Sequence, residues 1–484
     1  MNGIAAKERW MHKVQYSRRL EEKAHYQLIV CGGGVAGYAA ALAAARRGVR
    51  AALVEREGCL GGTATNCGVH FFLGGRKYNE KTNLLERKVG GIFDELTDAL
   101  IAEGAALELE NTDFKSYNPF GWYPRMAASV PFEPQRTKAF MERRLMEEGV
   151  KLYYFTSILD VAASGDKIDK IVCFNKSGMF SLGAECFVDA TGDADVAFFM
   201  GCPTRKGRPS DSLMAPASLE MVLDSVDGRE LVAYQNKHQS PKFAEIIDQL
   251  KEQSLWPFPF DIVVLMQLVE EDVFLVNTMR QIGVDGTDGD SVTAAMVEGR
   301  AGNLKLFELL RKYFPGFQKA RIRYIADKVG IRESRRITGL YNVSLADALT
   351  GKKFGDCIAA TTYNFDLPDP LAPSHDPMLG DARHPNDHRA HEEIEIPYQS
   401  LVPQGCCNLI AAGRCISVDR EVLGPARIMG PCFAMGQAAG LAAYVCLQRH
   451  IGYREVDALH VQALLLEENC LLPRRFTKKR GGCQ

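Results

Sequence analysis

The chain has 484 residues, of which 46% are hydrophobic and 24% charged, and its net charge is −2. These values are typical of a soluble globular protein with two or three domains. A nearly neutral chain lacks the basic excess that nucleic acids or anionic membranes attract, so neither partner is expected. Residues 1–25 are polar and lack an apolar core, so we predict no secretory signal and a cytoplasmic location.

Fourteen cysteines are scattered along the chain without a C-x-x-C pair or a regular spacing. This pattern predicts neither a zinc site nor a disulfide framework, and most of the thiols are expected to be buried. Cys59 and Cys67 flank a small-residue motif, and we interpret them as apolar filler rather than as reactive groups.

A polar segment precedes the first recognisable unit. We predict that residues 1–25 form a helical extension, which packs either against the body of the protein or against a second subunit. Residues 26–57 read YQLIVCGGGVAGYAAALAAARRGVRAALVERE, which predicts a strand, a glycine turn, a helix and a second strand. This order of elements is typical of a nucleotide-binding unit.

The glycine turn of this unit has the spacing G-x-G-x-x-G. Gly32, Gly34 and Gly37 stand where the chain turns sharply, approaches a pyrophosphate, and packs helix on strand. The helix at 35–47 directs its unpaired N–H groups and its positive dipole end toward the phosphates. Glu55, at the tip of the second strand, can accept hydrogen bonds from adenosine ribose hydroxyls. The motif predicts a dinucleotide site without separating FAD from NAD.

The nucleotide-binding domain is predicted to continue to residue 202. A loop of small residues at 58–65 allows its backbone to pass close beside a flat cofactor. The expected elements after it are helices at 82–103 and 134–148, a strand at 150–156 and a β-meander at 158–182. An apolar strand at 186–188 ends in D-A-T-G-D at 189–193, which returns the chain to the nucleotide sheet.

Residues 203–395 change in character and are predicted to form an inserted substrate domain. They contain Pro- and Gly-rich joints, strand-like apolar runs such as 217–223, and a helical stretch at 292–313. A polar loop carries four histidines, which lack the spacing of a ligand frame, so no metal site is predicted. These histidines are His375, His384, His388 and His391.

The nucleotide-binding domain is predicted to resume at residues 396–450. Residues 408–414 read N-L-I-A-A-G-R and predict another strand that ends in glycine. A helix is predicted to start near Pro431, which suits a first helical turn. Gly436 and Gly440 belong to a small-residue face, which lets this helix lie close to a strand or a flat ligand. Residues 451–484 are predicted to form a helical tail.

Three separated segments together resemble the flavoproteins that have a glutathione-reductase-type FAD domain. They are G-G-G-V-A-G at 32–37, D-A-T-G-D at 189–193 and A-A-G-R-C-I-S at 411–417. Further motifs resemble a bacterial FAD-dependent oxidoreductase family that is related to the fumarate reductase flavoproteins. These are L-G-G-T-A-T at 60–65, G-I-R-E-S-R-R-I at 330–337, I-P-Y-Q-S-L-V-P at 396–403 and P-C-F-A-M-G-Q-A-A-G at 431–440.

The resemblance implies an α/β fold, with a Rossmann-like FAD-binding domain that includes a β-meander and with an inserted α+β substrate domain. It implies FAD as the cofactor and a first set of binding residues for the pyrophosphate, the adenosine ribose and the ribityl chain. The implied cofactor residues are Gly32, Gly34, Gly37, Glu55, Arg56, Gly62, Thr63, Gly192, Asp193, Gly413 and Arg414. The start of the late helix, at Gly436, Gln437 and Ala438, is implied to face the flavin pyrimidine ring.

The resemblance implies a flavoenzyme that moves a hydride between the flavin and a small organic substrate. Arg332 and Arg335 are our candidates for holding a polar or anionic group, because the guanidinium group of arginine can form two parallel hydrogen bonds to a carboxylate. On a strand, residues three apart point to opposite faces, so Arg336 is expected to share the side of Arg332. A surface ion-pair cluster around Glu333 is an equally open interpretation.

A proton donor is also required, and the family motif Y-P-I-D-I-H that would supply a histidine reads Tyr363-Asn-Phe-Asp-Leu-Pro368 here. Because Pro368 replaces that histidine, Tyr363 and His375 are the alternative candidates.

Two other functions compete with this interpretation. A non-catalytic flavin-binding or electron-transfer subunit is one, although no iron–sulfur cysteine cluster supports it. A thiol/disulfide flavoenzyme is the other, because residues 61–68 resemble the loop G-G-T-C-L-N-x-G-C. Ala64 stands where the first redox cysteine belongs, and no second G-x-G-x-x-G follows. The pattern identifies neither the substrate nor the oligomeric state.

Overall fold

The computed structural model describes residues 17–79, 81–110, 112–113, 116–121, 128–376, 378, 380–381 and 393–477. Within these residues, a seven-stranded sheet has the order β7-β2-β1-β10-β9-β8, with β23 paired to β10. Its strands are β1 (Glu22–Cys31), β2 (Ala51–Val54), β7 (Lys151–Tyr153), β8 (Ser157–Ser164), β9 (Lys167–Asn175), β10 (Gly178–Asp189) and β23 (Leu409–Ala411).

Strand β10 belongs to two kinds of pairing. From Ser181 on it runs parallel to β1, and its last three residues run parallel to β23. Strand β1 runs parallel to β2, which in turn pairs with β7. The first half of β10 is antiparallel to β9, and β9 is antiparallel to β8. The predicted α/β fold with a parallel, Rossmann-like sheet is therefore confirmed, and the strands predicted at 158–182 form a meander that joins it.

Alternate residues of β1 pack into two different cores. Leu28 and Val30 belong to the larger cluster, which contains the helices α1 (Val35–Arg46) and α11 (Met429–Arg449). Ile29 and Cys31 belong to a second cluster with residues of β9 and of α5 (Asp195–Phe199). Because both faces of this end of the strand are buried, residues 28–31 form a continuous apolar run.

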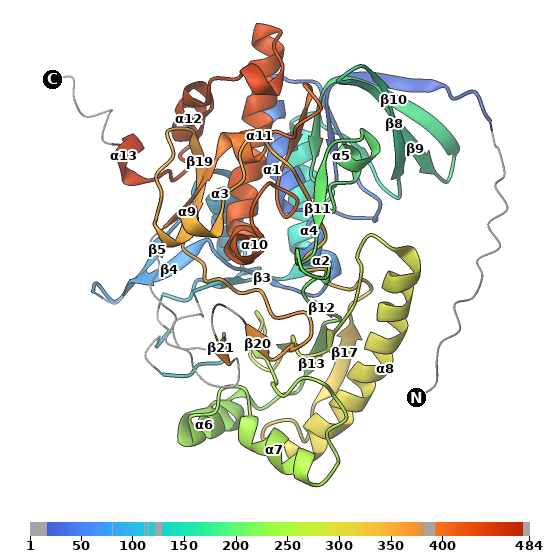
Figure 1. Cartoon of the computed structure of the whole chain (residues 1–484). Coiled ribbons are helices and arrows are strands. Elements are labelled where there is room, and N and C mark those ends of the chain that lie inside the picture. Colours follow the sequence, from blue (N-terminus) through green and yellow to red (C-terminus); the bar gives the residue numbers. More distant parts are fainter. Residues whose placement is uncertain are drawn as a thin grey trace.

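Helices α1 and α11 pack backbone against backbone, beside each other in Figure 1. A Cβ atom built on Gly436 would lie 2.1 Å from the carbonyl oxygen of Ala36, and one on Gly440 would lie 2.2 Å from that of Ala40. The small-residue face of α11 therefore lies against a helix, not against a strand or a flat ligand. By length and composition α11 is apolar enough to span a membrane, but 83% of its most apolar window is buried inside the protein, as in a core helix.

A second sheet lies below the first unit in Figure 1 and has the order β14-β15-β13-β17. One face of it, including Met221 and Leu223, packs on three helices. The other face, including Val222, meets Phe71 and Leu73 of the first unit. The elements are β13 (Met221–Asp224), β14 (Leu265–Gln267), β15 (Phe274–Val276), β17 (Arg321–Ile325), α6 (Gly228–His238), α7 (Ala244–Glu252) and α8 (Gly289–Tyr313).

Three predicted elements differ in the structure. The prediction of a helix at 1–25 is wrong at its C-terminal end, because β1 begins at Glu22. Residues 1–16 lie outside the part of the chain that the structure describes. The helix at 82–103 is split into β5 (Leu84–Arg87) and α3 (Gly91–Ala102), because Gly90 adopts a φ of 72°. Strand β19 (Cys357–Thr361) contacts α11, although it falls within the range 203–395. The domain boundaries stay predictions.

The remaining elements are shorter or lie at the edges of the two units. Helices are α2 (Thr63–Asn66), α4 (Pro134–Glu147), α9 (Leu345–Leu349), α10 (Arg420–Ala426), α12 (Ala458–Glu467) and α13 (Arg474–Thr477), with 3-10 turns at Tyr398–Ser400 and Tyr453–Glu455. Strands are β3 (Phe71–Phe72), β4 (Arg76–Asn79), β6 (Val130–Pro131), β11 (Thr204–Lys206), β12 (Ala217–Ser218), β16 (Arg280–Gln281), β18 (Arg335–Ile337), β20 (His375–Asp376), β21 (Gly380–Asp381) and β22 (Ile394–Pro397).

Candidate active site

Four strands of the parallel sheet end at the border of one cavity. The glycine turn follows β1, Glu55 follows β2, residues 190–193 follow β10, and residues 412–414 follow β23. The cavity has a volume of about 520 Å³ and extends to the second sheet. A ligand site at the carboxyl ends of parallel strands is the expected position in such folds, and its volume suits a cofactor or substrate.

The glycines of the first turn have different surroundings. Gly32 has a φ of +104°, and a Cβ there would lie 2.4 Å from the carbonyl oxygen of Ala190. A Cβ on Gly37 would lie 1.8 Å from the carbonyl oxygen of Gly32, so this residue packs helix on strand and does not border the cavity. Gly34 caps α1 and borders the cavity, and a Cβ there meets no heavy atom within 4 Å.

Glu55 is held by the main chain around it. Its Oε2 accepts from the N–H of Gly33 at 2.6 Å, and its Oε1 accepts from the N–H of Glu57 at 2.9 Å. The residue is 7% exposed and borders the cavity beside Arg56. Its carboxylate is therefore fixed at the tip of β2, at the end of the turn where an adenosine ribose is expected.

An ion pair links the loops that follow β10 and β23. Asp193 accepts from Nη2 of Arg414 at 2.7 Å and from the hydroxyl of Ser334 at 2.6 Å. Burial favours the neutral carboxyl, but the Arg414 charge and the Ser334 hydroxyl outweigh it and hold the pKa of Asp193 below its usual value. The two loops are thus fixed to each other at the cavity wall.

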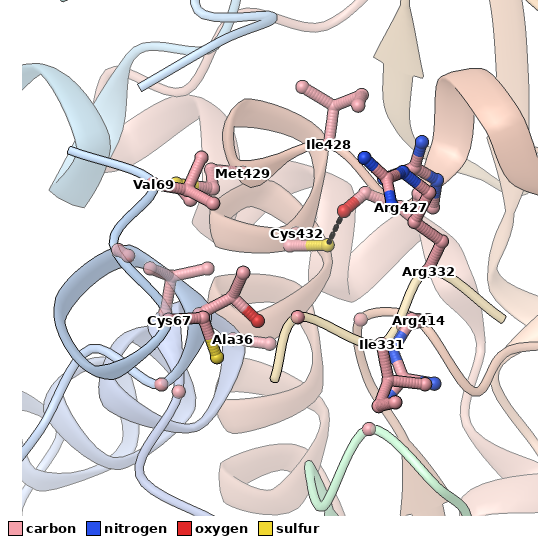
Figure 2. A pocket seen from close by; sticks show the side chains of 18 of the residues that line it. Ala36, Cys67, Val69, Ile331, Arg332, Arg414, Arg427, Ile428, Met429 and Cys432 are labelled. Carbon is pink, nitrogen blue, oxygen red and sulfur yellow. Dashed lines mark hydrogen bonds between the residues drawn. The ribbon is translucent and has the colours of Figure 1, made fainter. Parts of the chain in front are cut away.

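The start of α11 forms another part of the wall. Ile428, Met429 and Cys432 border the cavity, and Cys432 donates its Sγ–H to the carbonyl oxygen of Arg427 at 3.3 Å (Figure 2). In this turn the N–H of Gly430 donates to the carbonyl oxygen of Leu73 at 2.9 Å, that of Cys432 donates to the carbonyl oxygen of Ile428 at 3.1 Å, and Pro431 has no N–H. The turn therefore offers the cavity mainly the positive end of its dipole, which favours negative charge.

The far end of the cavity is rich in cations. Arg332, Arg427, Arg280 and Lys242 border it, and Figure 2 shows Arg332 close to Arg427. Burial, then the charges of Arg280 and Arg427, lower the pKa of the Arg332 guanidinium to about 10. The carboxylates of Glu220 and Asp366 also border the cavity and partly oppose this effect, and Asp366 lies 3.8 Å from Arg427. The four cations outnumber these two carboxylates, which favours an anionic partner.

The family of the chain follows from its sequence. The model of the family described as FAD dependent oxidoreductase matches residues 27–465, which is most of the chain. The chain belongs to this family. The description of this family names FAD as the cofactor.

The curated relatives match only short stretches of the chain, and the solved structures are similar to it in fold but not in sequence. The dihydrolipoyl dehydrogenase of Trypanosoma brucei brucei is 51% identical over 43 residues, 9% of either chain. The dihydrolipoamide dehydrogenase of Chaetomium thermophilum is 41% identical over 54 residues, 11% of either chain. The chain thus spans about a tenth of these curated proteins. A geranylgeranyl bacteriochlorophyll reductase-like structure from Thermoplasma acidophilum is 11% identical, with a TM-score of 0.45, over 94% of this chain and 84% of that one.

Most of the residues predicted to bind FAD border the cavity. Gly34 leaves open space in front of the first N–H groups of α1, as a close approach by pyrophosphate requires, so the residues present fit FAD. The predicted cofactor residues that border the cavity are Gly32, Gly34, Glu55, Arg56, Gly62, Thr63, Gly192, Asp193, Gly413 and Arg414.

The prediction for the late helix is wrong in register. Gly436, Gln437 and Ala438 do not border the cavity, because α11 begins at Met429 and these residues lie two turns into it. Gln437 instead accepts from the N–H of Ile92 at 3.0 Å. It also donates to the carboxylate of Glu468, at the C-terminal end of α12, at 2.7 Å. The cavity is bordered by the first turn of α11, and residues 436–438 hold the helix in place.

The three arginines of residues 332–336 point in three directions. Arg332 borders the cavity, whereas Arg335 does not. Arg335 donates instead to the carbonyl oxygen of Asp193 at 2.9 Å and to the carboxylate of Asp195. Arg336 pairs at 2.9 Å with Glu333, whose side chain is fully buried. Residues 331–334 are irregular, so the alternation expected of a strand does not apply and Arg336 does not share the side of Arg332. The ion-pair interpretation is right for Glu333, but the pair is buried.

The two candidate proton donors, Tyr363 and His375, both border the cavity, as does Pro368. The other histidines of the polar loop lie outside the residues that the structure describes. Sequence reasoning missed Arg427 and Glu220, which also border the cavity. A signal existed for Glu220, because it is the one charged residue in the apolar run 217–223.

Cys59 and Cys67 are free thiols with different surroundings. Cys59 donates to Oδ1 of Asn66 at 2.9 Å, and Cys67 borders the cavity with its Sγ 3.7 Å from the carbonyl oxygen of Val329. Burial raises the pKa of the Cys67 thiol to about 11, so the nucleophilic thiolate is disfavoured.

Serine at Cys59 or at Cys67 is therefore expected to leave FAD content and flavin reduction within about twofold of the parent protein. Visible spectroscopy and mass spectrometry of the non-reduced protein measure these properties. A disulfide between the two cysteines in the resting protein, with turnover lost in both variants, would restore the disulfide-reductase interpretation.

Proposed function

We propose that the protein exchanges a hydride between FAD and a small organic anion. The observation that supports this most is one cavity whose lining includes both the glycine turns and a cluster of guanidinium groups. When bound, FAD supplies the hydride and electron chemistry. The protein contributes the position of the substrate and its electrostatic environment.

The anion is inferred from unused hydrogen-bond donors. Arg332 donates from Nη1 to the carbonyl oxygen of Pro216 at 2.8 Å and to Ser218 Oγ at 2.6 Å, and from Nη2 to Asn277 Oδ1 at 3.1 Å. Within the described part of the chain, its Nε–H and one Nη2–H have no partner. The Nε–H of Arg427 is buried and also has no hydrogen-bond partner among the described residues. A carboxylate fits such planar donors, and it offsets the repulsion between the guanidinium groups.

The finer classification is part of the proposal. We assign the FAD-binding unit to the glutathione-reductase type, related to bacterial fumarate reductase flavoproteins, on the motifs at 32–37, 189–193 and 411–417. The first turn of α11 would stabilise negative charge on the reduced flavin through the positive end of its dipole. The second sheet, with α6–α8, would act as an inserted α+β substrate domain because its inner face adjoins the cavity.

The cellular setting is also proposed from the sequence. We propose a cytoplasmic location, as expected from the sequence. The near-neutral net charge supports a small-molecule partner, with no nucleic-acid or membrane partner. The oligomeric state stays open.

Arg332→Ala is expected to raise the KM for the anionic substrate about 10- to 100-fold, because it removes a charge-assisted contact of about 1.5–3 kcal/mol. The bound FAD should be retained. The FAD-loaded protein is mixed rapidly and anaerobically with a panel of carboxylates and their neutral amides, and flavin reduction is recorded. The dependence of the reduction rate on substrate concentration then gives the KM.

Arg323→Ala is the matched control, because Arg323 lies on β17 and pairs with Glu270 on the surface at 2.6 Å. It should leave the KM unchanged. Flavin reduction by the neutral amides alone, or equal kinetics of the Arg332→Ala and Arg323→Ala proteins, would contradict the proposed function.

A further inference from the structure

Glu220 is a buried carboxyl group at the substrate end of the cavity. It lies between β12 and β13, where the apolar run 217–223 is interrupted, and it is 2% exposed. It borders the cavity, and its Oε2 accepts no hydrogen bond from any residue that the structure describes. An unpaired carboxyl in such a position costs free energy, so a ligand that bonds to it would remove a penalty.

The groups around Glu220 are both charged and neutral. Arg332 and Arg280 attract its charged form, while the thiol of Cys67 and the backbone of Gly68 lie on the side of the first unit. Burial outweighs both arginines and raises the pKa of the Glu220 carboxyl to about 8. Near neutral pH the group is therefore available in both protonation states, as a proton-exchanging group must be.

We propose that Glu220 exchanges a proton with the substrate, and that the substrate is a hydroxycarboxylate, which becomes an oxocarboxylate. This inference rests on the proposed function. In the oxidation direction, the O–H bond of the substrate breaks and its proton passes to the carboxylate of Glu220. The C–H bond breaks and its hydrogen leaves with two electrons as a hydride to oxidised FAD. A C=O bond forms, and the reverse direction restores each atom.

The hydroxyl is favoured over other groups for a chemical reason. A neutral amine can release its hydride without first losing a proton, and an unactivated C–H bond is too weak an acid for a carboxylate to deprotonate. A hydroxyl needs a base of moderate strength as the carbonyl forms. Arg332 and Glu220 interact electrostatically and both border the cavity, so one substrate can meet the guanidinium group with its carboxylate and the Glu220 carboxyl with its hydroxyl.

The first experiment needs no substrate. The visible spectrum of the FAD-loaded protein is titrated with pH, and we expect a transition with an apparent pKa near 8. Glu220→Gln should abolish it. Glu57→Gln should keep it, because Glu57 pairs with Lys328 at 3.0 Å and lies outside the cavity lining. A parent protein without the transition, or a transition that persists in Glu220→Gln, would overturn the role of Glu220.

A second experiment uses the apoprotein, so it remains informative if Glu220→Gln does not retain FAD. The native state holds the Glu220 proton up to pH about 8, whereas the unfolded chain releases it near the ordinary carboxyl pKa of 4.5. Between these values the native state binds more protons, so the free energy of unfolding falls as pH rises. Glu220→Gln should remove this part of the pH dependence of the apoprotein. The same dependence in parent and variant would count against the assignment.

The last experiment separates this inference from the proposed function. FAD-loaded protein is mixed anaerobically with 2- and 3-hydroxycarboxylates and with the matching carboxylates that lack the hydroxyl. Flavin reduction by hydroxycarboxylates alone, slowed at least about 100-fold in Glu220→Gln, supports both. Reduction by the unsubstituted carboxylates, or parent rates in Glu220→Gln, overturns the inference and leaves the proposed function. No reduction by any carboxylate, and no reoxidation by the oxocarboxylates, overturns both.

Discussion

Gly34→Val is expected to give a folded protein that purifies with little FAD. Gly34 caps α1 with a φ of −64° and a ψ of 179°, which is extended backbone that valine adopts readily. A Cβ there meets no protein atom within 4 Å and projects toward the cavity. The protein can therefore accept the side chain, but the pyrophosphate can no longer approach the N–H groups of α1.

The affinity for FAD should fall about 100-fold or more, which corresponds to roughly 3 kcal/mol of lost phosphate contacts. Flavin absorbance per protein chain measures the occupancy, and circular dichroism with thermal unfolding measures the fold. Gly289→Val is the matched control, because Gly289 also begins a helix, α8, and a Cβ there also meets nothing within 4 Å. Full FAD occupancy in Gly34→Val would refute the placement of the pyrophosphate.

The cofactor end of the site was predictable because its rules are local. A glycine turn after an apolar strand has few backbone solutions, and each one points its N–H groups the same way. Carboxyl ends of parallel strands share one edge of a sheet, so the motifs after β1, β10 and β23 had to meet. Gly34, Asp193 and Gly413 accordingly border the same cavity although they are far apart in the chain.

The register of α11 was not predictable by the same reasoning. Small residues in a helix allow a close approach, but the pattern does not say what approaches. Gly436 lies against the backbone of Ala36, and this contact depends on how two helices cross on one face of the sheet. A helix that starts at Met429 rather than near Pro431 then places its first turn, not residues 436–438, at the cavity.

The substrate end depended on contacts that are distant in sequence. Arg332 and Arg335 have similar neighbours in the chain, but Asn277 holds one and Asp195 the other. Period-two alternation failed there because residues 331–334 are irregular. Glu220 was visible as a single charge in an apolar run, but only the folded protein shows that no described residue neutralises it by a hydrogen bond.

Gly436→Val is expected to destabilise the whole FAD-binding unit. A Cβ at this position would lie 2.1 Å from the carbonyl oxygen of Ala36, and backbone on both sides leaves neither atom free to move. Helices α1 and α11 would have to separate, and both belong to the largest core cluster. The cost should exceed about 3 kcal/mol, the upper end of ordinary overpacking, and thermal and denaturant unfolding of the apoprotein measure it.

The double variant Gly436→Val/Gly440→Val should not fold, because a Cβ on Gly440 meets the carbonyl oxygen of Ala40 at 2.2 Å one turn further along the same contact. Ala434→Val is the control on the same helix, since Ala434 is only half-buried. There the added methyl groups should cost about 0.5 kcal/mol, through helix propensity alone. An unfolding midpoint of Gly436→Val equal to that of Ala434→Val would show that residues 436–440 do not clamp the two helices, and would reopen their prediction as flavin-facing residues.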